Sequence, residues 1–299
     1  MASCHSSSCL SSAWSSCSRS MCRARFKKPR AQHWKKWAQP RNQNMPLIWQ
    51  SVLERPRDAM PLLMAHRGSS DELPENTLAA FQRALIQDAD VLETDIRFTR
   101  DDEIILMHDA ALDRTTNGSG IVANMTLAEI KKFRAQRSFD SKQILGAEEL
   151  PALAEFLEFT KSRNTPLALE LKDDRFIETR DAERLIKLLS RHNALERTVL
   201  LSFNGARIRA CKRVAPQIPI GIITLKNPFP LYDTELMGPV YPLLYLNPFY
   251  FAWAKRRGKI ACPLDPAPEP RLKFYRRLGA PVLLTNHPAV TRRALSILH

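Results

Sequence analysis

From residue 61 to the C-terminus, short apolar runs alternate with segments of helical periodicity. Apolar runs of this length, bounded by turn residues, are typical of buried strands, and the helices between them supply the crossovers that parallel strands need. Eight such units in about 240 residues predict a TIM-type (β/α)8 barrel, which is an α/β fold. A doubly wound open sheet is the alternative, but the glycine-rich G-x-G-x-x-G turn usual in that fold is missing. The expected strands are 61–66, 90–98, 166–172, 198–203, 219–224, 243–247, 259–264 and 281–286.

The first 58 residues differ from the rest in composition. Ten of the first twenty residues are Ser, and nine Lys or Arg but no Asp or Glu lie before Leu53. Subtracting these nine from the net charge of +14 leaves +5 for the remainder. Low hydrophobicity with high net charge favours disorder. We therefore expect a disordered basic, Ser-rich tail at 1–58 and one barrel domain at 59–299, with an insertion at about 100–147.

Three interpretations of this tail stay open: an organellar transit segment, a nucleic-acid arm, or translated sequence upstream of a start at Met45 or Met60. Its charges interleave with aromatic residues only at Trp34–Trp37, which indicates non-specific attraction and no specific nucleic acid. Its cysteines lack the paired spacing of a zinc site.

The sequence also indicates the cellular compartment of the protein. No apolar segment follows the N-terminal positive charges, which disfavours a secretory signal. No run of about 18 apolar residues is present, so we expect no transmembrane segment. The barrel region contains only Cys211 and Cys262, which favours a reducing, cytoplasmic location.

Residues 90–109 bring ionisable side chains together. Side chains of a strand alternate between its faces, so Glu93 and Asp95 point the same way. Two carboxylates side by side favour a bound cation or a shared proton. The polar turn at 100–102 is too short for a parallel crossover and predicts an antiparallel hairpin. That hairpin would return His108 to the carboxylates.

The same spacing of charges recurs at Glu170 and Lys172. Because the chemistry of a barrel lies at the C-terminal ends of its strands, we expect these residues to share one site with Glu93 and Asp95. Three carboxylates without a thiolate or histidine cluster suit one hard divalent cation, Ca²⁺ or Mg²⁺. Positive charge from Arg67 and Lys172 would suit an anionic substrate such as a phosphate ester.

Two asparagines also stand at the ends of expected strands, Asn247 in 243–247 and Asn286 in 281–286. Both would reach the C-terminal end of the barrel. We expect Asn247 to contact the substrate.

Six motifs follow one another in an order and spacing that resemble the glycerophosphodiester phosphodiesterase family, within the PLC-like phosphodiesterase superfamily. They are His66-Arg67-Gly68, Pro74-Glu75-Asn76-Thr77, Glu93-x-Asp95, His108-Asp109, Leu112-x-Arg114-Thr115-Thr116-x-Gly118-x-Gly120 and Glu170-x-Lys172. The resemblance covers about residues 61–290. It implies a TIM barrel with a hairpin insert after the second strand, and metal-dependent hydrolysis of glycerophosphodiesters to glycerol 3-phosphate and an alcohol.

The resemblance also implies residue roles. Glu93, Asp95 and Glu170 match the metal ligands of the family. His66 and His108 match its acid–base pair, and imidazoles with a pKa near about 6.5 can divide two proton transfers near neutral pH. Arg67 and Lys172 match phosphate-contacting positions, and Glu75 would support the site. The sequence does not distinguish which histidine acts first as the base.

The C-terminal third departs from the family pattern. Residues 261–265 read Ala-Cys-Pro-Leu-Asp where the family usually has a Trp-Thr-Val-Asn strand, and 285–288 read Thr-Asn-His-Pro where it has a Thr-Asp-x-x-Pro-like motif. We expect neither difference to touch the metal ligands or the two histidines. Both differences concern the substrate pocket.

Two other functions compete with this one: a lysophospholipase D acting on lysophospholipids, and a catalytically idle barrel-fold binding protein. The segment 241–253 is apolar and aromatic, and the basic segment 255–259 follows it. This pattern predicts a packed helix with a solvated end. The alternative is a lipid-facing lip, which would give a peripheral membrane contact.

Overall fold

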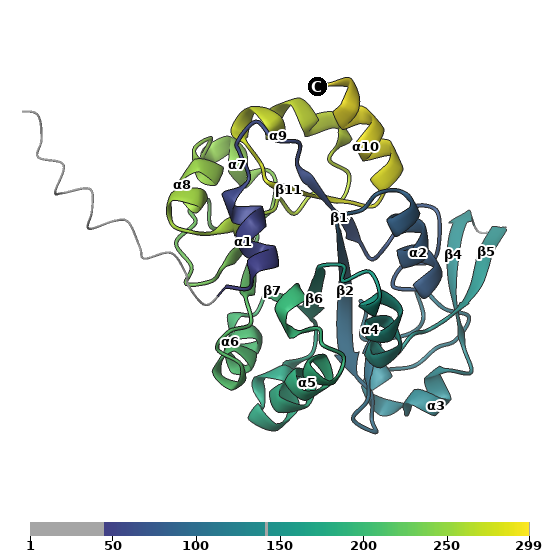
Figure 1. Ribbon diagram of the computed structural model, residues 1–299. Helices are drawn as coiled ribbons and strands as arrows, with labels where there is room; N and C mark the ends of the chain where they lie inside the picture. Colours follow the sequence, from purple (N-terminus) through teal and green to yellow (C-terminus); the bar gives the residue numbers. More distant parts are fainter. Residues whose placement is uncertain (1–44, 141–142, 299) are drawn as a thin grey trace, which may run out of the picture. The chain divides into compact units, whose positions relative to one another are not determined.

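The computed structural model describes residues 45–140 and 143–298. Eight parallel strands form the predicted barrel in the order β10-β9-β8-β7-β6-β2-β1-β11, with helices outside the strands (Figure 1). The barrel is nearly closed, because Asn286 N, after β11, donates to Pro266 O, after β10, at 2.8 Å. The strands are β1 (Leu62–His66), β2 (Val91–Phe98), β6 (Leu167–Leu171), β7 (Thr198–Ser202), β8 (Ile220–Thr224), β9 (Leu236–Pro239), β10 (Ile260–Ala261) and β11 (Val282–Thr285).

The helices follow the strands largely as the alternation predicts. Thr77 caps the first of them, its side chain accepting from Ala80 N. The helices of the barrel are α2 (Leu78–Ile86), α4 (Leu153–Lys161), α5 (Thr179–Arg191), α6 (Gly205–Val214), α7 (Leu243–Leu246), α8 (Tyr250–Arg256), α9 (Leu272–Leu278) and α10 (Pro288–Ile297). Short 3-10 segments are η3 (Asp174–Ile177), η4 (Leu195–Arg197) and η5 (Glu269–Arg271).

One expected strand is wrong. Residues 243–247 do not form a strand, because Leu243–Leu246 is helix α7 and Asn247 ends it. The sixth strand of the barrel is β9, a Leu-Met-Gly-Pro segment that pairs in parallel with β8 and β10. Short apolar runs suit a buried strand and a buried helix equally, and the Gly-Pro pair concealed the true strand, since both residues are depleted in strands.

The segment after β2 contains the predicted hairpin. β3 (Ile104–Leu106) pairs antiparallel with β2, and a capping box formed by Thr126 and Glu129 starts α3 (Leu127–Ile130). A second hairpin, which the sequence analysis did not predict, is made of β4 (Arg134–Asp140) and β5 (Gln143–Glu149). A 3-10 turn, η2 (Val122–Asn124), precedes α3.

The two faces of each barrel strand pack into two different hydrophobic cores. Outward-facing residues such as Leu63, Leu92 and Leu169 pack with Phe81 of α2 and Phe156 of α4. This outer core joins the sheet to its helices. Along each strand the alternate residues face the barrel interior.

The interior is closed by a helix that precedes the barrel, α1 (Leu47–Glu54). Trp49 and Val52 of α1 pack with Met64, Val91 and other inward-facing strand residues. The expected disordered tail is therefore wrong over α1, where two apolar residues, Trp49 and Val52, are buried against strands that the local sequence pattern does not indicate. Residues 1–44 of that expected tail lie outside the described residues.

Trp49→Ala tests whether α1 is part of the fold. Trp49 is only 1% exposed, and removing a buried Trp leaves a cavity that costs about 3–5 kcal/mol. We expect the free energy of unfolding in urea to fall by that amount. Leu47→Ala in the same helix is the control, because Leu47 is 81% exposed. Equal effects of the two substitutions would show that α1 does not close the barrel.

Candidate active site

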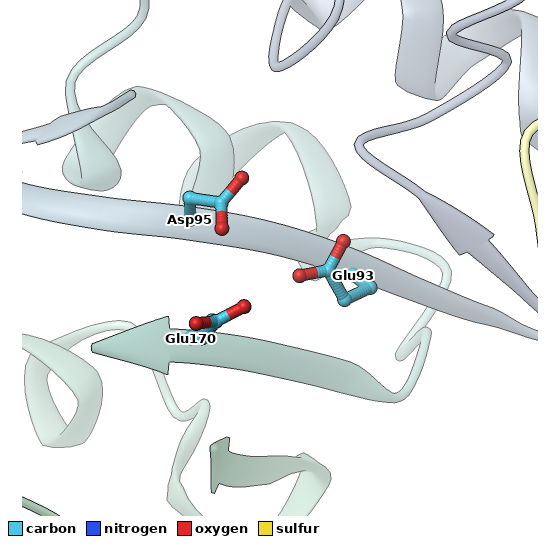
Figure 2. A group of neighbouring side chains, drawn as sticks. All are labelled: Glu93, Asp95 and Glu170. Atoms are coloured by element: carbon cyan, nitrogen blue, oxygen red, sulfur yellow. The ribbon is translucent and has the colours of Figure 1, made fainter. Parts of the chain in front are cut away.

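The register of three neighbouring strands aligns the predicted site residues. His66 of β1 stands opposite Glu93 of β2, and Asp95 of β2 stands opposite Glu170 of β6. Oxygens of the three carboxylates lie within 4.8 Å of one another, and all three residues are buried. Figure 2 shows these carboxylates, two from β2 and one from β6, directed toward a common space.

The three carboxylates ionise unequally. Burial and the neighbouring charge of Asp95 raise the pKa of Glu93 well above its ordinary value and raise the pKa of Glu170 to about 7. Burial also opposes the ionisation of Asp95, but Arg67 and Lys172 outweigh burial and keep the pKa of Asp95 below its ordinary value. Carboxylates this close compete for a shared proton or a cation.

Two basic side chains lie against Asp95. Arg67 Nε is 3.0 Å from Oδ2 of Asp95, and Lys172 Nζ is 3.2 Å from Oδ1. Lys172 Nζ is also 2.6 Å from Glu170 Oε1. Among the described residues, Asp95 Oδ1 and Arg67 Nε nevertheless have no partner in hydrogen-bond geometry. A buried carboxylate oxygen without a hydrogen bond is costly, and together with two further carboxylates it fits a hard divalent cation.

The loop after β1 aims Arg67 at the cluster. Arg67 has a left-handed backbone with φ of 59°, and its N–H donates to Glu93 O at 3.0 Å and to Glu93 Oε2 at 3.1 Å. Gly68 follows with φ of +86°, and a Cβ there would lie 2.6 Å from the carbonyl carbon of Ala80. Only glycine fits this position without moving the backbone of α2.

The β2–β3 hairpin places His108 beside Asp95, as predicted. Met107 N donates to Asp95 O at 2.9 Å, and the guanidinium of Arg97 donates twice to His108 O, at 3.0 and 2.8 Å. His108 Nδ1 lies 2.5 Å from Asp109 Oδ1. Nε2 is therefore the nitrogen left for a substrate.

His66 is held from the other side. Its Nδ1 lies 2.7 Å from Asn286 Oδ1, so the departure from the family pattern at 285–288 does touch a histidine and our expectation was wrong there. The reason is the closure of the barrel, which pairs β11 with β1. Burial, followed by the charge of Arg67, lowers the pKa of His66 to about 4.

A chain of ion pairs joins His108 to Arg67 through Asp109 and Arg114, two motif residues to which the sequence analysis assigned no role. Arg114 Nε lies 2.5 Å from Asp109 Oδ2. Arg114 also donates to both oxygens of Glu75, at 2.7 and 3.0 Å, and Glu75 Oε1 accepts from Arg67 at 2.9 Å. The hydrogen bond from Arg114, followed by that from His108, lowers the pKa of Asp109 to about 2. Glu75 thus links Arg114 to Arg67 beside the carboxylates.

Asn76, which the sequence analysis named only as part of a family motif, contacts the carboxylate cluster. Its side-chain oxygen accepts from Thr94 Oγ1 at 2.8 Å, and its side-chain nitrogen donates to Asp95 Oδ2 at 3.2 Å. Asn76 is 3% exposed and has a left-handed φ of 59°. The sequence feature that could have indicated this contact is the position of Asn76 between Glu75 and Thr77, the N-cap of α2.

Asn247 lies apart from the carboxylates. Its Nδ2 donates to Pro228 O at 2.8 Å, and its Oδ1 accepts from Phe249 N at 3.1 Å. It follows helix α7 and does not end a strand. These contacts connect two loops at the mouth of the barrel.

Comparison with known proteins assigns the chain to a family. The profile of the glycerophosphoryl diester phosphodiesterase family matches residues 66–237, more than half of the chain. The chain belongs to this family. It is 37% identical over 195 residues to a glycerophosphodiester phosphodiesterase of Caldanaerobacter subterraneus subsp. tengcongensis, covering 64% of this chain and 76% of that protein. A glycerophosphodiester phosphodiesterase of Bacillus subtilis is 34% identical over 258 residues, covering 76% and 84%. This member of the family is thus a phosphoric diester hydrolase.

Solved structures confirm the barrel. A phosphodiesterase of Oleispira antarctica, solved in complex with the product sn-glycerol-3-phosphate, superposes with a TM-score of 0.69 at 24% identity and covers 79% of this chain and 97% of that one. Identity this low supports the fold alone. Among the helices described here, none combines the length and apolar character needed to cross a bilayer.

Asn76→Ala tests how far the site depends on this one side chain. The substitution removes the hydrogen bonds that Asn76 makes to the buried side chains of Thr94 and Asp95. Each polar group left unsatisfied destabilises the fold by about 1–3 kcal/mol. We expect the free energy of unfolding to fall by at least that amount.

Asn164→Ala is the matched control. Asn164 also has a left-handed backbone, with φ of 48°, but it is exposed. The difference between the two variants in urea unfolding isolates the buried hydrogen bonds from the backbone cost. A difference near zero would contradict the proposed support of Asp95.

Proposed function

We propose that this protein hydrolyses glycerophosphodiesters to glycerol 3-phosphate and an alcohol with one divalent cation, Ca²⁺ or Mg²⁺, and a pair of histidines. The observation that carries the proposal is the buried cluster of three carboxylates, whose oxygens lie within 4.8 Å of one another. The phosphodiesterase of Oleispira antarctica bound to sn-glycerol-3-phosphate supports the nature of the product.

Glu93, Asp95 and Glu170 would hold the cation. A bound divalent ion would neutralise charge on the phosphoryl oxygens. Arg67 and Lys172 keep positive charge beside the carboxylates, where the phosphate of the diester would approach. Both are part of the cluster already, at 3.0 and 3.2 Å from Asp95.

His66 and His108 would carry the two proton transfers. Cleavage of the diester needs a base for the attacking hydroxyl, from the substrate glycerol or from water, and an acid for the leaving alkoxide. Each imidazole has its Nδ1 fixed by an oxygen, that of Asn286 or that of Asp109. Each therefore offers Nε2 to the reacting atoms. The chain from Asp109 through Arg114 to Glu75 would hold His108 in this orientation.

Metal dependence is tested by the release of glycerol 3-phosphate from glycerophosphocholine. We expect activity with Ca²⁺ or Mg²⁺, its loss in EDTA, and a loss of at least about a hundredfold in Glu170→Gln, because the charge stabilisation that a cation supplies is worth several kcal/mol. Glu158→Gln is the control, since the Glu158 side chain is 61% exposed. Full activity of Glu170→Gln in EDTA would exclude a catalytic cation held by this cluster.

The histidines are tested separately. We expect His66→Ala and His108→Ala each to lower kcat about 10²- to 10⁴-fold, the usual contribution of a general acid or base. His192→Ala is the control, because His192 ends α5 and pairs with Glu158 at the surface. Unchanged turnover in His108→Ala would contradict the assigned pair. No hydrolysis of any diester with any divalent cation would favour a binding protein over an enzyme.

A further inference from the structure

Exposed apolar side chains gather in one part of the barrel. Of the thirteen large hydrophobic residues that are exposed in the described ranges, seven lie within residues 225–253. They come from the loop after β8 and from helices α7 and α8, which are neighbours in Figure 1. Six of them form what we call the apolar rim: Leu225, Phe229, Leu231, Leu246, Phe249 and Trp253.

Hydrogen bonds and a ring contact hold the segments of the rim together. Asn247 hydrogen-bonds to Pro228 O on one side and to Phe249 N on the other, which ties the α7–α8 junction to the loop after β8. The rings of Phe229 and Trp253 meet edge to face with centroids 6.1 Å apart. Leu246 and Phe249 nevertheless remain 74% and 72% exposed. Fixed positions with this exposure favour an interaction surface over an unpacked part of the core.

Positive charge borders the rim. Lys255 and Lys259 do not contribute to this charge, because they donate to the backbone oxygens of Arg55, after α1, and Thr234, before β9. Arg256 is exposed and follows Trp253 by three residues on α8, so the two side chains are neighbours on the helix surface. The loop after β8 adds an exposed Lys226 and an exposed Asp233. The exposed basic residues Lys226 and Arg256 outnumber the exposed acidic residue Asp233, which favours an anionic partner.

The rim lies at the same end of the barrel as the carboxylates. The loop that carries Leu225 follows β8, and parallel strands end on one face. Phe203, after β7, is 45% exposed, and Lys172 Nζ lies 5.6 Å from the centre of its ring. A cavity of about 40 Å³ has Glu93 and Glu170 in one wall and apolar residues of β8 and β9 in another. Apolar residues therefore border the site on the side of β8 and β9, the two strands that the rim segments follow.

We propose that the apolar rim docks into the interface of an anionic phospholipid bilayer. Trp, Phe and Leu side chains beside Lys and Arg are what interfacial membrane binding requires, and basic residues add attraction to anionic lipids. The consequence for the substrate rests on the proposed function: the diester cleaved at the membrane carries an acyl chain on its glycerol, as a lysophospholipid does. Water then cleaves the bond between phosphate and alcohol, and the products are the alcohol and an acylated glycerol 3-phosphate. The lipid-facing lip considered from the sequence corresponds to part of this surface.

The test uses sedimentation of the full-length protein with vesicles of phosphatidylcholine containing phosphatidylglycerol, at a salt concentration that weakens attraction of the basic N-terminal segment. We expect the double variant Leu246→Glu/Phe249→Glu to bind at least about tenfold more weakly, because each buried Leu or Phe side chain contributes that much to an equilibrium. The control is Ile86→Glu/Ile297→Glu. These residues are 60% and 78% exposed and end α2 and α10, away from the rim.

The same proteins are assayed on glycerophosphocholine, a soluble diester, and on a lysophospholipid in vesicles. We expect the rim variant to retain the first activity and to lose at least about tenfold of the second, in proportion to the lost binding. Vesicle binding without any hydrolysis would reject the proposed function and leave the docking surface intact. Equal binding by the rim variant and the control variant would overturn the docking proposal. So would rim-dependent self-association in size-exclusion chromatography without vesicle binding, since the surface would then fit a second copy of the chain.

Discussion

The parallel register of β1, β2 and β6 is the constraint on which the site depends. Every second residue of a strand faces the barrel interior. Along β2 this interior face reads Val91, Glu93 and Asp95, so it passes from apolar to charged in the direction of the strand. The apolar half packs with Trp49 of α1, and the charged half forms the carboxylate cluster. A shift of one residue would turn the carboxylates outward into the outer core.

The charged half is stable because its groups are held by several elements at once. Burying carboxylates together is unfavourable unless cations or hydrogen-bond donors compensate. Arg67 comes from a strained loop, Lys172 from the end of β6, and Asn76 from the start of α2. The β2–β3 hairpin adds His108 and the ion pairs of Arg114, so this insertion is part of the site and not only an attachment to the barrel.

The mouth of the barrel has two chemically different sides. Charged and hydrogen-bonding residues follow β1, β2 and β6, whereas exposed aromatic and aliphatic residues follow β8 and β9. A lysophospholipid has the same division, with its phosphodiester at one end and the acyl chain of its glycerol at the other. Asn247, which we expected to bind substrate, instead braces the apolar side. The departures from the family pattern after residue 260 adjoin both sides.

The sequence by itself determined the fold class and the chemistry of the cluster, because strand periodicity places Glu93 with Asp95 and Glu170 with Lys172 regardless of what surrounds them. It also indicated the return of His108, since a short polar turn allows only an antiparallel hairpin. It could not show that Leu243–Leu246 is a helix, that α1 closes the barrel, or that Asn286 reaches His66. Those features depend on contacts between segments far apart in the chain, and local patterns carry no information about such contacts. Only the closed barrel, which brings its first and last strands together, decided them.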